Sequence, residues 1–184
     1  MTLSFRNYRV QEAKAIKTVS SRARCLQDLA ADVRNRTIEL LQAANPAELT
    51  WTPPGTSNHI LWHAGHALWV EDALCIQLVT GASELPLDWN AIFRMGSRPA
   101  SWKKPWPAKE ELLSALSAQR TRLLYLIGSL RDAQLDCQPP FPHAGDPRTL
   151  GESILHGLHD EANHQGEMYL LLKMQRFALG DPGG

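Results

Sequence analysis

The chain has 184 residues, enough for one domain with a sizeable hydrophobic core. Its 19 lysines and arginines balance 19 aspartates and glutamates, so electrostatics gives no basis for binding nucleic acid or an anionic membrane. No segment has the roughly 20 apolar residues that cross a bilayer, and the first residues lack the apolar run of a secretory signal. We therefore expect a cytoplasmic protein with neither nucleic acid nor membrane as its partner.

The three cysteines are Cys25, Cys75 and Cys137, an odd number without a CxxC pair. That usage favours a reducing compartment and argues against a disulfide framework or a zinc ribbon. We expect Cys25 and Cys75 to be small buried apolar residues, because unpaired cysteines are among the most buried residue types.

Hydrophobic periodicity predicts four long helices and no strand. In chain order these helices cover residues 19–44, 56–79, 107–130 and 149–177. A shorter pattern at residues 10–17 continues the first helix or forms a separate arm. Thr56 or Ser57 is the expected N-cap of the second helix, because it follows a Pro-Pro-Gly turn. We assign residues 1–184 to a single domain and expect a disordered tail from about residue 179, where Gly and Pro dominate.

The connection between the second and third helices, Gly81 to Trp106, is unusually long and rich in aromatic residues. Structureless loops of this length are uncommon in compact domains and are often functional. Its aromatic side chains either seal the side of the helices or form a wall over a pocket. Both interpretations remain open at the level of the sequence.

A weak internal repeat relates residues 40–54 to residues 126–140 at a constant offset of 86. Each copy closes a helix, makes a turn and leads through a double proline to a histidine-bearing helix. A chance resemblance between two helix-ending loops is one explanation. The other is two helix–loop–helix halves packed as an all-α four-helix bundle. We predict this bundle with up-down-up-down order, so that its second and fourth helices run in the same direction.

The fourth helix carries a polar stripe formed by His156, Asp160, His164 and Glu167. Their spacings of four, four and three place them within an arc of roughly 80°. Leu171 lies in the same arc, so the stripe is expected to face the core. Buried imidazoles and carboxylates are costly unless they are paired or bound to a cation, and the stripe therefore indicates a divalent metal site.

A second stripe, on the second helix, consists of His59, His63 and His66. His66, Asp160 and His164 lie at similar levels along their helices, so they are expected to converge as metal ligands do inside helix bundles. Each histidine also has a structural interpretation as a hydrogen-bonded core residue, and His59 in particular as part of the helix start. Two further histidines stand apart. His159 points about 100° away from Asp160, and His143 lies in an exposed loop.

The segments NHILWHAGHALWVEDAL, NPAELTWTPP and DEANHQGEMYLLLK resemble the DinB-like (DNA-damage-inducible, YfiT-like) family of metalloenzymes. The resemblance implies one histidine ligand on the second helix, matched by His66, and two ligands four residues apart on the fourth, matched by Asp160 and His164. Most relatives have histidine where this chain has Asp160, although the similar mycothiol-dependent maleylpyruvate isomerases carry a carboxylate there. His63 and His156 are the alternative ligands if the site lies one turn away.

Two histidines and one carboxylate leave coordination positions open for water and substrate, and they suit zinc or nickel, with iron as a third candidate. The resemblance implies a thiol-dependent transferase or a metal-dependent hydrolase acting on a small molecule, with a homodimer as the assembly. Glu167 and His63 are the expected catalytic side chains, orienting an imidazole or carrying a proton, with His156 as a further candidate. A low-molecular-weight thiol would need cations for its carboxylates, for which Arg98, Lys103 and Lys104 are candidates.

Two alternatives to that enzyme remain. One is a non-catalytic module in which a metal saturated by protein ligands stabilises the bundle or a dimer. The other is an iron-binding domain similar to the N-terminal domain of ergothioneine-forming sulfoxide synthases. Asp160 interrupts the paired-histidine motif of that domain.

Overall fold

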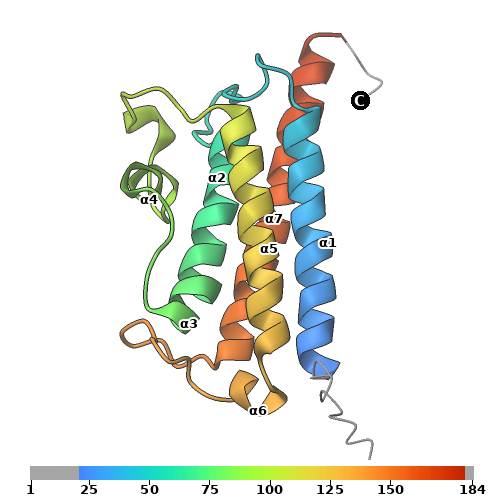
Figure 1. The fold of residues 1–184 in the computed structure, drawn as a ribbon. Helices are drawn as coiled ribbons and strands as arrows, with labels where there is room; N and C mark the ends of the chain where they lie inside the picture. Colours follow the sequence, from blue (N-terminus) through green and yellow to red (C-terminus); the bar gives the residue numbers. More distant parts are fainter. Residues whose placement is uncertain (1–20, 181–184) are drawn as a thin grey trace, which may run out of the picture.

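The computed structural model describes residues 21–180, and all regular structure within that range is helical (Figure 1). The predicted all-α fold class is thereby confirmed. Four long helices dominate: α1 (Ser21–Ala43), α2 (Ile60–Glu71), α5 (Lys109–Ser129) and α7 (Leu150–Ala178). A capping box starts α7, where Thr149 Oγ1 accepts from the Glu152 amide and the Glu152 carboxylate accepts from the Thr149 amide. Residues 10–17 and 181–184, for which we predicted an arm and a tail, lie outside the described residues.

The second helix begins later than expected and is not uniformly α-helical. His59 is the N-cap, since its Nδ1 accepts from the Trp62 amide at 3.1 Å, so the prediction of Thr56 or Ser57 was wrong. Both of those residues remain in the loop after the double proline. Beyond Glu71 the helix passes through a π-helical turn, η1 (Asp72–Ile76), into α3 (Gln77–Thr80). Gly81, with φ of 80°, ends it in the left-handed conformation that favours glycine.

The helices do not alternate in direction as we predicted. In Figure 1, α1 and α7 run upwards, whereas α2 and α5 both run downwards. Side-chain contacts agree, because His63 lies beside His164 while Cys75 faces Gly157, so α2 and α7 are antiparallel. The reason is the segment from residue 81 to residue 106, which carries the chain back along the whole bundle before α5 begins. The order is therefore up-down-down-up.

This order fits the internal repeat. The two copies belong to two helical hairpins, α1 with α2 and α5 with α7, each connected through a double-proline loop. The hairpins pack in inverted orientation, since α1 is antiparallel to α5 just as α2 is antiparallel to α7. A short helix, α6 (Asp132–Leu135), lies in the second loop and has no counterpart in the first.

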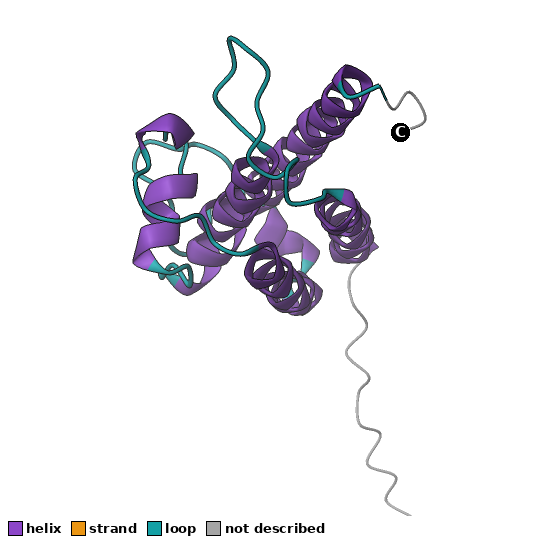
Figure 2. Cartoon of the chain, turned by 90° about the horizontal axis from the view of Figure 1, so that it is seen from above, coloured by secondary structure: helices purple, strands orange, loops and turns teal. Residues whose placement is uncertain are grey.

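The segment from residue 81 to residue 106 contains α4 (Leu87–Phe93) and a 3-10 turn, η2 (Pro99–Ser101). Seen from above in Figure 2, it forms a separate layer on one side of the four long helices. Its helix α4 packs on α2, against which Trp89 and Phe93 are buried. Phe93 packs so closely on Gly65 that a Cβ atom there would overlap its ring. The aromatic residues thus seal the side of α2, one of the two interpretations that the sequence left open.

Two hydrophobic clusters make up the core, one on either side of a polar layer. The cluster nearer the first double-proline loop includes Leu41, Leu68 and Phe93, and the other cluster surrounds Cys75 and Leu123. Cys75 is buried as predicted. The prediction for Cys25 was wrong, because this residue lies on the solvent side of the first turns of α1. None of the three cysteines forms a disulfide.

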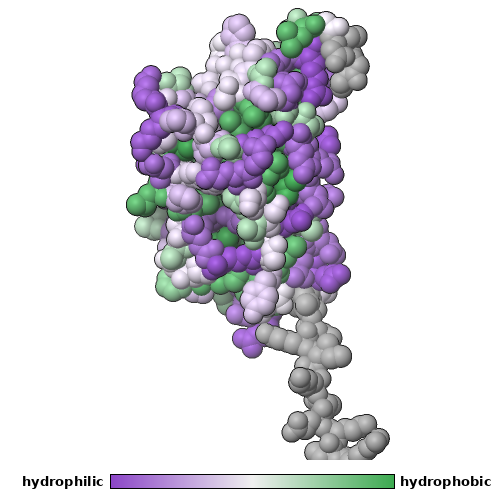
Figure 3. Space-filling model, turned by 45° about the horizontal axis from the view of Figure 1, so that its top comes forward, coloured by the Kyte–Doolittle hydropathy of each residue, from purple (hydrophilic) through white to green (hydrophobic). Residues whose placement is uncertain are grey.

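On the face shown in Figure 3, hydrophobic and hydrophilic residues alternate in small groups. Among the helices of residues 21–180, not one combines the length and apolar character that a membrane span requires.

Candidate metal centre

Five polar side chains face one another between the antiparallel helices α2 and α7. Helix α2 contributes His63 and His66, which are 3% and 4% exposed, and α7 contributes Asp160, His164 and Glu167. Their spacing of three or four residues places each set on one helical face. The structure thus brings together the three predicted ligands, His66, Asp160 and His164, although the helices that carry them run in opposite directions.

The atoms of these three residues have the separation expected of metal ligands. Asp160 Oδ2 lies 3.6 Å from His66 Nε2 and 3.4 Å from His164 Nε2, too far for strong hydrogen bonds. Around a tetrahedral ion with metal–ligand distances of about 2.0–2.1 Å, neighbouring ligand atoms are roughly 3.3 Å apart. Asp160 Oδ2 is also buried without a hydrogen-bond partner among the described residues. A cation would satisfy this oxygen, so the residues fit a divalent ion.

The imidazole of His66 is fixed by residues that sequence analysis did not identify. Its Nδ1 lies 2.5 Å from the carbonyl oxygen of Phe93, which leaves Nε2 directed towards Asp160. The ring stacks between Trp62, at a centroid distance of 4.6 Å, and Trp69, at 5.6 Å. A carbonyl acceptor on the far nitrogen sets the tautomer and orientation of a metal-binding histidine. For Phe93, the only signal in the sequence was the aromatic composition of residues 81–106.

A second group, formed by His63, His164 and Glu167, has different spacing. His164 Nδ1 lies 2.8 Å from His63 Nδ1 and 2.9 Å from Glu167 Oε2, and His63 Nδ1 lies 3.0 Å from the same carboxylate oxygen. These separations match hydrogen bonds and are shorter than the roughly 3.3 Å between ligand atoms around a tetrahedral ion, although the three atoms also lie close enough together to hold an ion. A proton on His164 Nδ1 can be donated to Glu167, which leaves His164 Nε2 free to bind metal. This arrangement supports the predicted orienting role of Glu167 and His63.

The charges of the group follow from burial and from these contacts. The His164 imidazole lowers the pKa of Asp160 against the opposing effect of partial burial, so this carboxylate is ionised at neutral pH. Burial lowers the pKa of His164, but Asp160 and Glu167 outweigh it and the net shift is upwards. Burial and the neighbouring histidines lower the pKa of His63 to about 3, so its imidazole is neutral.

The alternative ligand pair, His63 with His156, is not brought together. Because α2 and α7 are antiparallel, the start of α2 faces the later turns of α7, and His156 lies near the other end of α2. His156 and His159 are exposed, and the latter points away from the site as predicted. His143 is exposed in its loop as expected, with Nε2 2.9 Å from the carbonyl oxygen of Ala73. His59 serves the helix start instead.

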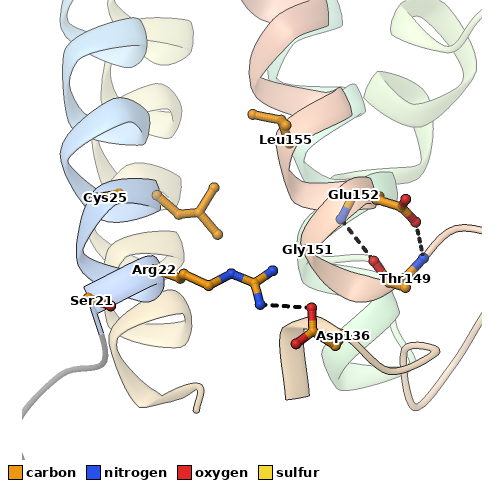
Figure 4. Close-up of a pocket in the computed structure, with 9 residues that line it drawn as sticks. Ser21, Arg22, Cys25, Asp136, Thr149, Gly151, Glu152 and Leu155 are labelled. Carbon is orange, nitrogen blue, oxygen red and sulfur yellow. Dashed lines mark hydrogen bonds and ion pairs between the residues drawn. The ribbon is translucent and has the colours of Figure 1, made fainter. Parts of the chain in front are cut away.

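Two cavities flank the metal centre. The first, which we call the His63 cavity, has a volume of about 330 Å³ and is lined by His63, Glu167, the loop from Pro53 to Asn58, and α7. The second, the Arg148 cavity, has a volume of about 400 Å³ and reaches Asp160 from the opposite side. A third cavity, of about 500 Å³, lies around Arg22 and Asp136 at the start of α1 and contains none of the centre's residues (Figure 4).

The cations that we expected from the sequence line neither of the two flanking cavities. Lys104 pairs with Asp88 on α4, and Arg98 lines a separate surface hollow beside Trp102. Lys103 is exposed near the 3-10 turn. The cation that does approach the centre is Arg148, which sequence analysis missed. Its only signal was its position directly before the N-cap of α7, the helix that carries Asp160 and His164.

No protein in a search of curated sequences matches this chain. The family model of the DinB superfamily matches residues 29–168, a range that begins in α1 and ends in α7 after the last ligand. That range covers most of the chain and contains all five residues of the centre. The chain therefore belongs to the DinB superfamily.

Proposed function

We propose that this protein is a metal-dependent enzyme in which His66, Asp160 and His164 hold one divalent ion. The observation that carries the proposal is the buried Oδ2 of Asp160, which has no hydrogen-bond partner within residues 21–180 and lies 3.4 and 3.6 Å from the Nε2 atoms of two imidazoles. Two nitrogen ligands and one oxygen ligand favour zinc or nickel, and iron(II) is also compatible with this set.

The centre supports catalysis better than a purely structural metal. A structural zinc site has four protein ligands, whereas three leave a position for substrate. His63 is not part of the group around Asp160, because its Nδ1 contacts His164 Nδ1 and Glu167 instead. When bound, the ion would lower the pKa of a thiol or a water molecule and so supply a nucleophile at neutral pH.

We assign to His63 and Glu167 the handling of the proton that such a nucleophile releases. Both line the His63 cavity, and the Glu167 side chain is 58% exposed there, so it can exchange protons with solvent. We assign to Glu167 the role of holding His164 and receiving the proton. Neutral His63 keeps that carboxylate in place.

Transfer involving a low-molecular-weight thiol is our first choice of reaction, and metal-dependent hydrolysis is the second. A small-molecule substrate is part of this proposal, and so is a homodimer, which exposed apolar residues along α7 support. These are Leu155, Leu170, Met174 and Phe177. The same residues favour the alternative function, a metal-stabilised dimerisation module without catalysis. Three cysteines without a disulfide support a cytoplasmic location.

Elemental analysis of the purified protein tests the metal centre directly. We expect about one zinc, nickel or iron per chain in the wild type and a loss of most of it in His66→Ala and His164→Ala. The matched control is His159→Ala, an exposed histidine of α7 outside the centre, and it should retain the metal. A wild type that binds no metal after dialysis against each ion would refute the proposal. Equal retention in all variants would refute the ligand assignment.

A further inference from the structure

The Arg148 cavity is enclosed by segments that are distant in the sequence. Trp69 and Val70 come from α2, Asn90 from α4, and His143 and Arg148 from the loop before α7. Its lining residues also include His156 and the proposed ligand Asp160. A molecule in this cavity therefore lies against the metal centre.

Arg148 is held in a fixed position beside this cavity. Asp146 accepts hydrogen bonds from its Nε at 2.9 Å and from its Nη2 at 2.7 Å, and the arginine side chain is 33% exposed. The third nitrogen of the guanidinium, Nη1, takes no part in this bidentate pair. Since the pair fixes the side chain in advance, binding of an oxyanion by the remaining N–H groups orders little additional structure.

Two further polar side chains of the cavity, Asn90 and His143, are each held in place by one hydrogen bond. Asn90 Oδ1 accepts from Trp69 Nε1 at 2.7 Å, which holds the amide in place and leaves its NH₂ group as a donor. His143 is held through Nε2 by the Ala73 carbonyl oxygen. A pre-positioned donor such as the Asn90 NH₂ group gives a small-molecule site its orientation and specificity.

The two cavities beside the metal centre differ in charge. Among the described residues, neither lysine nor arginine lines the His63 cavity, whose wall combines apolar residues such as Leu170 and Met174 with uncharged polar loop residues and the Glu167 carboxylate. Arg148 lines the other cavity. The loop after the first double proline lines the His63 cavity, and the loop after the second contributes His143 and Arg148 to the other.

We infer that the Arg148 cavity is the subsite for the carboxylate of a small organic acid, with Arg148 as its recognition residue. This inference rests on the proposed function, because a divalent ion held by one carboxylate and two neutral imidazoles adds one net positive charge beside the guanidinium. The Asp146 carboxylate offsets the charge of the guanidinium, so the net charge of the ion and the guanidinium N–H groups outside the Asp146 pair are what favour an anionic ligand. The apolar and uncharged part of the reactants belongs in the His63 cavity.

Calorimetric titration of the zinc-loaded protein with succinate tests the subsite, with the uncharged succinamide as comparison. We expect succinate to bind the wild type and succinamide to bind at least tenfold more weakly. Arg148→Gln should weaken succinate binding about tenfold or more, as expected for loss of a charge-assisted hydrogen bond, and Arg148→Lys should lose less. Zinc content is measured in every sample.

Arg22→Gln is the matched control, because Arg22 also lines a cavity and pairs with an aspartate, Asp136, at 2.7 Å (Figure 4). It should bind succinate like the wild type. If Arg148→Gln binds succinate as tightly as the wild type, or if the zinc-loaded wild type binds no succinate, the inference is wrong and the metal centre stands. If the wild type holds no zinc, the proposed function fails and the inference fails with it.

Discussion

At the scale of single residues, the candidate centre depends on how each imidazole is held. His66 and His164 both direct Nε2 at Asp160, and both have an acceptor at Nδ1, the Phe93 carbonyl for one and the Glu167 carboxylate for the other. Spacing along one helix was enough to predict Glu167, because it lies three residues after His164. Phe93 could not be predicted, since it reaches His66 only through the folding of a separate segment.

Glu167→Gln should weaken metal binding without abolishing it. The amide cannot supply the negative charge that favours the proton on His164 Nδ1, so we expect affinity to fall by roughly 10- to 100-fold. Competition with a chromophoric chelator measures this change. Glu110→Gln, at an exposed glutamate in the first turn of α5, is the control and should leave affinity unchanged. Equal affinities for all three proteins would mean that Glu167 does not support the ligand.

At the scale of elements, the sequence predicted the four long helices but not their directions or the π-helical turn. Capping and periodicity are local properties, so Thr149 and the apolar repeat located α7 correctly. The direction of a helix depends on where the preceding connection ends in space. The sequence of the long segment after Gly81 contains no local feature that indicates its path. The ligands still converge, because His66 and Asp160 both lie away from the ends of their helices. Reversing the direction of one helix changes the height of such a residue along the bundle only a little.

Substitution by alanine should change stability in opposite directions at two helical glycines, because only Gly65 lies in the contact between α2 and α4. Gly65→Ala places a methyl group against the Phe93 ring, so we expect a loss of about 1–3 kcal/mol in the free energy of unfolding. Metal affinity should fall as well, because Phe93 also holds His66. Gly166→Ala has no atom within 4 Å of its new methyl group and should gain about 0.5–1 kcal/mol from helix propensity. Chemical denaturation of both variants measures these changes. An unchanged free energy of unfolding in Gly65→Ala would show that α4 moves away from α2 freely.

At the scale of the whole molecule, a buried ionic layer separates the two hydrophobic clusters and connects three helices. Arg34 of α1 donates to Glu71 of α2 at 2.5 Å and to Glu161 of α7 at 2.8 Å. Thr37 donates to Glu161 at 2.6 Å. Sequence analysis missed this layer, because each helix contributes only one charged side chain to it and only the assembled fold brings them together. Removing one partner, or shifting one hairpin along the other, would leave a buried charge unpaired. The layer therefore favours one fixed register between the two hairpins.

This layer gives stability an unusual pH dependence. Burial raises the pKa of Glu71 to about 7, although Arg34 opposes the shift, and Glu71 Oε1 has no hydrogen-bond partner among the described residues. The folded protein therefore holds the Glu71 proton more tightly than the unfolded chain, whose value is near 4.5. The resulting stabilisation is complete below pH 4.5 and is lost as pH rises through about 7, with a magnitude on the order of 3 kcal/mol.

Glu71→Gln removes this titration while keeping an oxygen that can accept from Arg34. We therefore expect the free energy of unfolding of the wild type to fall relative to that of the variant between pH 5 and pH 8, measured by urea denaturation across that range. Glu39→Gln, at an exposed glutamate paired with Arg36 on α1, should differ from the wild type by a constant amount. A constant difference for Glu71→Gln as well would mean that Glu71 is ionised throughout the range and that Arg34 fully compensates its burial.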